Sequence, residues 1–412
     1  MSAIIDTRTA AERIRELANA DFQTVVGFRR QLHRHPELSF HEHETAAFVA
    51  ERLREIGFTV RTGVAGTGVI GDLAGDKPGP TVMLRADIDA LPIHETTDLE
   101  YASVNAGVMH ACGHDLHTAC LLGAARILAK MRQYLSGSVR VLFQPAEELA
   151  PGGAAPMIAE GALQPSTVAA PSAVFGLHTW PRLPAGTIAV RGGVFMASND
   201  EIEITVRGQG GHAAEPHLLS ADPVLVAAHI LVALQTVVSR NRPPETAGVL
   251  SFGAVHANGA TNIIPDTVSI SGTLRSMDRQ WRHSALHRIQ TLVKNTALAF
   301  GAEADCEVLE GYPVLINDQA SADFVRSEGM SFLGSDKVHE APLWFAAEDF
   351  ARYLEHLPGA FFLLGVNRPD VQVTGLHTAT YSPDEAAMET GASFLARIAL
   401  AYCHKEVVTE SK

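Results

Sequence analysis

Hydrophobic positions in the first 190 residues alternate between helical spacing and short β-rich runs. The pattern predicts helices over residues 24–34, 44–56 and 116–131, and strands over residues 69–73, 81–85, 139–143 and 174–177. Helices and strands that alternate along a chain are typical of an α/β layer with a largely parallel sheet. We therefore expect this fold class for the beginning of the chain.

The middle of the chain has a different order of elements. Strand, helix, strand, strand, helix and strand are predicted over residues 201–207, 223–239, 249–255, 268–274, 279–300 and 306–309. The first of these strands alternates strictly between apolar and polar positions, and Asp222 with Pro223 provides an N-cap and a first-turn proline for the helix that follows. This βαββαβ order is that of a ferredoxin-like unit.

After Pro313 the α/β pattern returns, with helices predicted over residues 320–328 and 385–403 and a strand over residues 360–365. The simplest organisation is one α/β domain that a second domain interrupts. We expect residues 1–195 and 313–412 to form the α/β domain and residues 196–312 to form the ferredoxin-like insert.

Composition and charge exclude several classes of protein. The 412 residues contain 46 Asp and Glu against 32 Lys and Arg, a formal charge of −14, which disfavours a nucleic-acid or anionic-membrane partner. No apolar run is long enough to span a bilayer, and charges interrupt the N-terminus before a secretory signal core could form. The four cysteines are scattered and form no CxxC pair, so we expect a reducing, cytoplasmic location.

Residues suited to metal binding cluster at the ends of predicted strands. Cys112 and His114 precede a predicted helix, residues 144–148 follow a strand, His178 ends another strand, and His377 lies near the C-terminus. In open α/β sheets, ligands bind outside the carboxyl ends of the strands, so these segments are expected to converge. Thiolate, imidazole and carboxylate donors together suit Zn²⁺ or Mn²⁺.

Catalysis by a cysteine nucleophile is the main alternative for Cys112. The sequence shows no evident His and Asn or Asp partner pattern for that chemistry, whereas His114 is well spaced for chelation. The adjacent Glu147 and Glu148 could also be two solvated loop residues. Their position directly after an apolar strand argues against that interpretation.

Several longer strings carry a resemblance to a known family. They read LRADIDALP, HACGHDLH, FQPAEE and GGHAAEPH at residues 84–92, 110–117, 143–148 and 210–217, with shorter matches HRHPE, NIIPD and AEDF at residues 33–37, 262–266 and 347–350. The chain resembles the amidohydrolase branch of the dinuclear aminoacylase and metallocarboxypeptidase family, which holds hippurate hydrolases, N-acyl-amino-acid hydrolases and auxin-conjugate hydrolases. The resemblance spans nearly the whole chain and implies the same interrupted fold, with the insert as a lid and dimerisation domain.

The resemblance implies two divalent metal ions per subunit, Mn²⁺ or Zn²⁺ more often than Mg²⁺. Its metal ligands fall on Cys112, His114, Glu148, His178 and His377. Cys112 is expected to be shared, with His114 and His178 on one ion and Glu148 and His377 on the other. A thiolate ligand also argues against Mg²⁺ and Ca²⁺, because those ions prefer oxygen.

The resemblance also assigns roles beside the metals. Glu147 is expected to act as the general base, since a carboxylate within hydrogen-bond reach of the attacking water can take its proton. Asp87 is expected to orient a metal ligand by a hydrogen bond. His117 and His217 match the family strings, but their roles stay open.

Three residues of the insert are expected to serve the substrate. His212 matches a histidine that stabilises the oxyanion of the tetrahedral intermediate. Asn262 and Arg275 match residues that hold the substrate's carboxylate, a task for which a guanidinium offers a bidentate fork. A dinucleotide-binding turn at residues 208–211 is disfavoured because the third glycine is missing at the required spacing.

Together these expectations describe a cytoplasmic enzyme that hydrolyses the amide bond of small N-acyl-amino acids of the hippurate or N-acetyl type. It would release a carboxylic acid and an amino acid, and the family implies a homodimer through the lid domain. A dipeptidase or metallocarboxypeptidase, or an N-acetyl-diaminopimelate deacetylase, is an alternative with the same chemistry. A non-catalytic metal- or peptide-binding relative is a second alternative; it would be expected to lack Glu147 or a ligand, and this chain lacks neither.

Overall fold

The computed structural model describes residues 7–368 and 374–404, and these residues form two compact units. The first unit takes Met1–Gly193, Ile316–Pro342 and Arg352–Lys412, and the second takes Val194–Leu315 and Leu343–Ala351. Residues 343–351 pack with the second unit, although the sequence pattern assigned everything after residue 312 to the first. No helix in the described part of the chain is long and apolar enough to cross a membrane.

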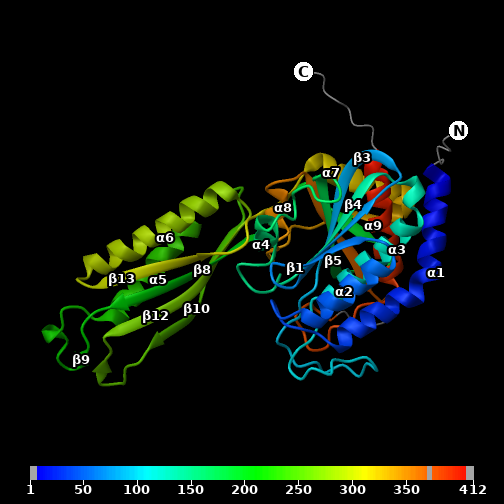
Figure 1. The fold of residues 1–412 in the computed structure, drawn as a ribbon. Coiled ribbons are helices and arrows are strands. Elements are labelled where there is room, and N and C mark those ends of the chain that lie inside the picture. The colour runs from blue at the N-terminus through cyan, green and yellow to red at the C-terminus, as the bar shows by residue number, and fades with distance from the viewer. Residues whose placement is uncertain (1–6, 369–373, 405–412) are drawn as a thin grey trace, which may run out of the picture. The chain divides into compact units, whose positions relative to one another are not determined.

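An eight-stranded sheet forms the centre of the first unit, in the order β1-β2-β4-β3-β5-β16-β6-β15 (Figure 1). In chain order its strands are β1 (Thr59–Val64), β2 (Gly68–Ala74), β3 (Lys77–Asp87), β4 (Ser136–Gln144), β5 (Pro171–Pro184), β6 (Ile188–Val190), β15 (Val338–Glu340) and β16 (Gly359–Asn367). The central pairs β4–β3, β3–β5 and β5–β16 are parallel, and so is β6–β15, whereas β1–β2, β2–β4 and β16–β6 are antiparallel. The expected α/β class with a mostly parallel sheet is confirmed.

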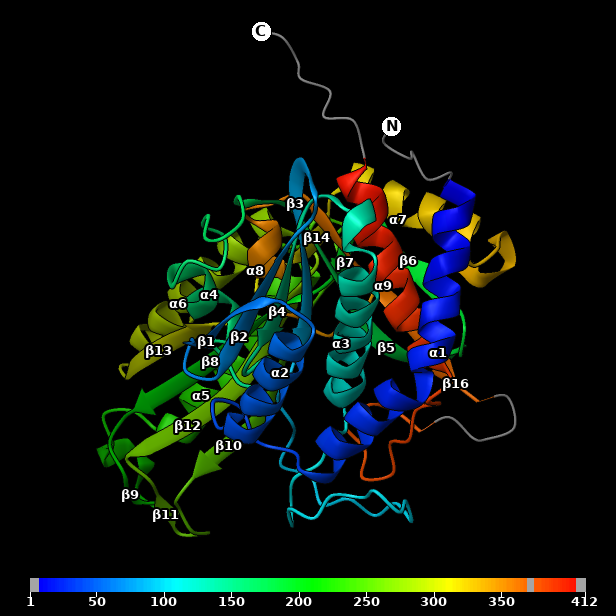
Figure 2. The ribbon, with the colours of Figure 1, turned by 45° about the vertical axis from the view of Figure 1, so that its right-hand side comes forward.

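The helices of the first unit are α1 (Thr7–Arg34), α2 (His43–Glu55), α3 (His114–Lys130), α4 (Ala154–Ala159), α7 (Gln319–Phe332) and α9 (Ala387–Cys403), and the short α8 (Ala351–Leu354) starts at the unit boundary. Figure 2 shows α1, α3 and α9 side by side, where they contact one another. Helix α3 is buried on nearly every side, as is typical of a helix in a core. Helix α1 begins 17 residues earlier than predicted, because charged residues obscure the buried face that Ile14, Leu17 and Val25 form.

Parallel pairing brings the ends of three strands to one edge of this sheet. Asp87 at the end of β3 lies opposite Gln144 at the end of β4, and Arg85 of β3 lies opposite Gly176 of β5. The residues that follow β3 and β4, and His178 within β5, therefore lie at the carboxyl edge. The sheet topology thus gathers chain segments that are far apart in sequence.

The second unit contains an antiparallel four-stranded sheet in the order β10-β12-β8-β13. Its elements follow the chain as β8 (Ser198–Arg207), α5 (Pro223–Ser239), β10 (Gly248–Ala257), β12 (Thr267–Ser276), α6 (Arg279–Ala299) and β13 (Glu303–Glu310). Asp222 is the N-cap of α5, since its Oδ1 accepts the N–H of Val224 at 2.9 Å. Two small pairs complete the strands, β9 (Gly211–His212) with β11 (Ile263–Ile264), and β7 (Gly193–Met196) with β14 (Leu315–Asn317).

Candidate metal centre

Two groups of possible metal-binding side chains share one cysteine at the carboxyl edge of the first unit's sheet. The first group is Cys112, His114 and His178, and the second is Cys112, Glu148 and His377. Within each group the potential ligand atoms lie within 4.8 Å of one another. The structure therefore brings together all five side chains that the sequence suggested as ligands, in the two expected sets. Their role as ligands stays a prediction.

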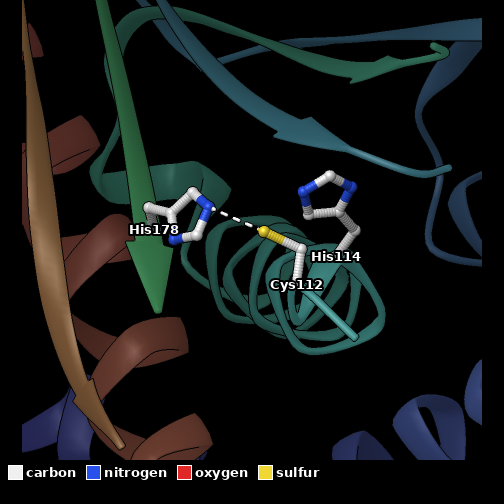
Figure 3. Close-up of side chains that lie close together, drawn as sticks. All are labelled: Cys112, His114 and His178. Atoms are coloured by element: carbon white, nitrogen blue, oxygen red, sulfur yellow. Dashed lines mark hydrogen bonds between the residues drawn. The ribbon is translucent and has the colours of Figure 1, made fainter. Parts of the chain in front are cut away.

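The side chains of Cys112 and of His178, which lies within β5, face each other (Figure 3). The Cys112 Sγ lies 3.4 Å from the His178 Nε2. His178 donates its Nδ1–H to the carbonyl of Thr179 at 2.8 Å, which leaves a lone pair on Nε2 on the side of Cys112. Gly113, at φ +92°, turns the chain into α3; a Cβ there would lie only 2.7 Å from the Thr179 hydroxyl, so the turn requires glycine.

His114 is held from one side only. Its Nδ1 lies 2.9 Å from the backbone oxygen of Asp89 and 3.1 Å from the Asp89 Oδ1, so Nδ1 carries the donated proton. The Nε2 is buried and makes no hydrogen bond within the described chain. Burial alone would lower the pKa of His114, but Asp87 and Asp89 outweigh burial and raise it to about 10. Negative charge therefore exceeds positive charge around this imidazole.

Glu148 and His377 complete the second group, although more than 200 residues separate them in the sequence. The His377 Nε2 lies 3.3 Å from the Glu148 Oε1. The backbone of His377 has a φ of +60°, and its N–H donates to the Ala111 carbonyl at 2.8 Å, which fixes it beside the Cys112 segment. A non-glycine residue in this left-handed conformation is uncommon and often marks a functional site.

These side chains fit a divalent cation. A thiol, three imidazoles and a carboxylate are the donors that zinc and similar ions bind, and the buried Nε2 of His114 makes no hydrogen bond among the described residues. Burial, together with the charges of Glu148 and Glu147, raises the pKa of the Cys112 thiol well above its usual value. A bound cation would compensate this negative charge and favour the thiolate.

Glu147 lies beside this cluster and contributes to a further group with His114 and Glu148. Its side chain is nearly buried, and its Oε2 lies 4.0 Å from the His114 Nε2. The position suits a carboxylate that acts on a molecule bound at the cluster. Its role as the general base stays a prediction.

Asp89 rather than Asp87 holds the His114 imidazole, and the expected role of Asp87 in orienting a metal ligand stays a prediction. Asp87 makes no hydrogen bond to His114, because its Oδ2 lies 3.7 Å from the His114 Nε2. The Asp87 carboxylate instead accepts hydrogen bonds from the His117 Nδ1 at 2.6 Å and from the Arg85 Nη1 at 2.7 Å. Asp89 contacts the His114 Nδ1 instead. The sequence carried a signal for Asp89, since residues two apart in an extended segment project to the same side.

The structure also separates the two histidines whose roles were open. His117 uses both ring nitrogens, because Nδ1 donates to Asp87 and Nε2 accepts the backbone N–H of Thr179 at 2.8 Å. It therefore has no free nitrogen for a metal ion. His217 is exposed on a single 3₁₀ turn, Pro216–Leu218, and nothing in the structure gives it a role.

The three substrate residues expected in the insert lie in two separate places of the second unit, one beyond the start of β12 and one near its end. His212 pairs with Ile263, and the Ala213 N–H donates to the Asn262 carbonyl at 3.1 Å, so His212 and Asn262 are neighbours. Arg275 lies near the other end of β12, where it pairs with Asn199. At the usual rise per strand residue, the eight steps from Thr267 to Arg275 span about 26 Å. The structure does not bring Asn262 and Arg275 of one chain together, because the length of β12 lies between them.

A mostly parallel α/β sheet with a Cys, His and Glu cluster at its carboxyl edge defines a class of metal-binding hydrolases. The chain belongs to the peptidase family M20/M25/M40, whose model matches residues 83–401. It is 41% identical to the N-acetyl-L-cysteine deacetylase of Bacillus subtilis (strain 168) over 378 residues, which cover 90% of this chain and 86% of the relative. It is 38% identical to thermostable carboxypeptidase 2 of Saccharolobus solfataricus over 386 residues, 92% of this chain and 96% of the relative.

A solved structure shares this architecture. The YXEP protein of Bacillus subtilis, a dinuclear metal-binding peptidase of the M20 family, superimposes with a TM-score of 0.82 at 34% sequence identity. The match covers 94% of this chain and 99% of that protein. The family resemblance inferred from the sequence motifs is therefore confirmed, and the chain is an enzyme of the M20 amidohydrolase family.

Proposed function

We propose that this protein is a metal-dependent amidohydrolase that cleaves N-acyl-amino acids into a carboxylic acid and an amino acid. The observation that carries the proposal is the position of Glu147 beside two side-chain groups that share Cys112. The similarity to an N-acetyl-L-cysteine deacetylase supports this substrate class. The acyl group and the amino acid are left to experiment.

The proposed centre holds two divalent ions, Mn²⁺ or Zn²⁺. His114 and His178 would bind one ion, Glu148 and His377 the other, and Cys112 both. When bound, such ions polarise a carbonyl and lower the pKa of water. Asp89 and the Thr179 carbonyl would hold the two imidazoles in the tautomer that carries its proton on Nδ1.

Glu147 would move the proton in this reaction. Its carboxylate would accept a proton from the attacking water and deliver it to the nitrogen of the leaving amine. Its low exposure and its position beside His114 suit a group that moves the proton of a molecule bound at the cluster. A non-catalytic relative would have no need of such a group.

Recognition of the substrate would use His212 for the oxyanion and Asn262 and Arg275 for the carboxylate. His212 and Asn262 lie beyond the Thr267 end of β12, and Arg275 lies near the other end of that strand. A single second unit therefore cannot apply both places to one small substrate. This separation supports a homodimer through the second unit. In such a dimer, Arg275 of one copy and His212 with Asn262 of the other would serve the same substrate.

Carboxypeptidase activity is the second candidate, and the 38% identity to thermostable carboxypeptidase 2 favours it. A peptide with a free C-terminus presents the same two groups, an amide and a neighbouring carboxylate. Hydrolysis of acetyl-, benzoyl- and indoleacetyl-amino acids should be compared with hydrolysis of dipeptides, each with Mn²⁺ and with Zn²⁺. Faster turnover of the dipeptides would reject the first proposal in favour of the second.

The proposed cellular setting is the cytoplasm. All four cysteines are free thiols, which agrees with a reducing compartment. The excess of acidic residues agrees with a small-molecule substrate and no nucleic-acid partner.

A further inference from the structure

The segment that carries Glu147 and Glu148 starts from a strained residue. Ala146 is fully buried and has a φ of +53°, in the left-handed region that residues with a Cβ rarely adopt. This conformation sets the direction in which the chain leaves β4, and therefore the direction of the two glutamates that follow. Something in the surrounding structure must hold Ala146 in this state.

The carboxylate of Glu42 contacts Ala146 directly. Its Oε1 accepts the Ala146 N–H at 2.8 Å, and its Oε2 lies 2.5 Å from the Thr67 hydroxyl. On the other side of the same residue, the Gly153 N–H donates to the Ala146 carbonyl at 3.1 Å. Both backbone groups of Ala146 are therefore held, the N–H by Glu42, which is distant in the sequence, and the carbonyl by Gly153, seven residues later.

The role of Glu42 is not explained by the helix that it precedes. Glu42 is the N-cap of α2, yet its side chain makes no capping hydrogen bond to that helix. The side chain is fully buried, and burial raises the pKa of its carboxyl group, as does the nearby Asp89. Burying a carboxyl group is unfavourable unless its hydrogen bonds compensate, so its contact with Ala146 calls for a reason.

A second carboxylate acts on the same segment. The Oδ2 of Asp89 accepts the N–H of Glu148 at 2.9 Å. Glu42 and Asp89 thus hold the backbone on the two sides of Glu147, one before it and one after it. This arrangement leaves the Glu147–Glu148 backbone little freedom to rotate.

We propose that Glu42 is a positioning residue that holds Ala146 in its left-handed conformation and so directs Glu147 and Glu148 toward the Cys112 cluster. The inference rests on the proposed function for the roles of these two glutamates. It concerns the geometry of the site, and the binding of a metal ion alone can test it.

The chain contains a matched control for this interaction. Ala65 also has a φ of +53°, and its N–H donates to the Oε2 of Glu160 at 2.9 Å. Glu160 is exposed and lies at the end of α4. Glu160→Leu therefore removes the same kind of contact at a site without metal-binding side chains.

The experiment compares Glu42→Leu, which is similar in size but cannot accept a hydrogen bond, with Glu42→Gln, whose amide oxygen still can. Titration with Zn²⁺ or Co²⁺ should show that Glu42→Leu weakens metal binding about 10- to 100-fold, the usual effect of losing a residue that orients a ligand. We expect kcat to fall by a similar factor with little change in KM. Glu42→Gln and Glu160→Leu should both stay close to wild type.

Ala146→Gly provides the rescue. Glycine adopts a positive φ without steric cost, so adding it to Glu42→Leu should recover most of the lost metal affinity. Ala146→Val, which leaves Glu42 in place but disfavours the left-handed conformation, should reproduce the loss, and it tests the proposal even if Glu42→Leu does not fold.

Wild-type metal affinity in Glu42→Leu or in Ala146→Val would overturn the proposal, and so would a Glu42→Gln variant as impaired as Glu42→Leu. Metal titration requires no substrate. Failure of the wild-type protein to hydrolyse any acyl-amino acid would reject the proposed function and leave this result intact. Conversely, wild-type metal affinity in Glu42→Leu would reject the positioning role of Glu42 and would leave the proposed hydrolysis of acyl-amino acids untouched.

Discussion

The Nε2 of His117 accepts the backbone N–H of Thr179 at 2.8 Å, which connects the first turn of α3 to β5 one residue after His178. The same ring donates its Nδ1–H to Asp87 at the end of β3. Burial lowers the pKa of His117, in agreement with the neutral tautomer that this pair of hydrogen bonds requires. One imidazole therefore joins three elements that carry or adjoin the predicted metal ligands.

His117→Phe should keep a ring of similar size and remove one hydrogen bond each from Asp87 and Thr179. We expect metal affinity to fall about 10- to 100-fold, and the free energy of unfolding to fall by about 1–3 kcal/mol. His110 is a matched control, because it is also buried in this motif but neither ring nitrogen makes a hydrogen bond in the described structure. Metal titration and thermal unfolding of His110→Phe should give values near wild type. Equal effects of the two substitutions would contradict the connecting role of His117.

Removal of metal should abolish activity, and Mn²⁺ or Zn²⁺ should restore it. Because Cys112 belongs to both groups, Cys112→Ala should reduce the bound metal at both positions, whereas His377→Ala should leave one ion in place. The metal content per chain, measured by atomic emission after dialysis, distinguishes the two results. A Cys112→Ala protein with full metal content and no activity would indicate a cysteine nucleophile instead.

Glu147→Gln keeps the size of the side chain but cannot accept a proton. We expect metal content to stay at the wild-type level and kcat to fall about 10²- to 10⁴-fold, the usual contribution of a positioned acid or base. Glu148→Gln is the matched control and should lose metal. If the two variants show the opposite pattern, the roles of the neighbouring glutamates are exchanged.

Mixing two inactive variants tests the proposed homodimer. Arg275→Ala and His212→Ala remove residues that lie near the end of β12 and beyond its start. If each site draws on both copies, a mixed dimer has one intact site, so random exchange should restore about one quarter of wild-type activity. Activity should be assayed after the two proteins are unfolded and refolded together. Absence of any recovery, with mixed dimers verified by mass, would show that each chain uses its own residues.

Protonation of His33 should make a pH-dependent contribution to the free energy of unfolding. Its Nδ1 contacts the Asp115 Oδ2 at 2.9 Å and its Nε2 contacts the Glu95 Oε1 at 3.2 Å, so both nitrogens can donate when the ring is protonated. Burial opposes protonation, but Asp115 and Glu95 outweigh it and raise the pKa of His33 above 6.5. The stabilisation is fully present below pH 6.5 and is lost as the pH rises through the folded-state pKa.

His33→Gln should therefore reduce the free energy of unfolding more at pH 6 than at pH 9, as measured by urea unfolding at both values. His41→Gln, at an exposed position, is the control and should show no such difference. An effect of His33→Gln that is the same at both pH values would mean that the ring is neutral in the folded protein.

The fold class could be predicted from the sequence because its signals are local. The β-rich runs around Val82 and Val141 and the cap at Asp222 depend on neighbouring residues only, and the structure places strands and a helix there. The order of strands in the sheet could not be derived in this way, because β16 enters next to β5 from a segment almost 200 residues later.

The candidate site shows the same limit. Cys112, His114 and Glu148 stand in motifs whose donor atoms are visible in the sequence. Asp89 and Glu42 act through backbone N–H groups of distant residues, at Glu148 and Ala146, and backbone groups leave no mark in a sequence. Their function becomes visible only when the chain is folded.

His377 stands almost 200 residues after His178, and this distance has a consequence for the order in which the centre can be assembled during synthesis. Cys112, His114 and His178 have all been synthesised when less than half of the chain has been made, whereas His377, the partner of Glu148, is added among the last 40 residues. Since the N-terminal part of a chain begins to fold first, the two ions would be acquired at different times. A truncated product that ends before His377 would retain only one of the two groups, and so would lack a complete centre with which to act on cellular amides.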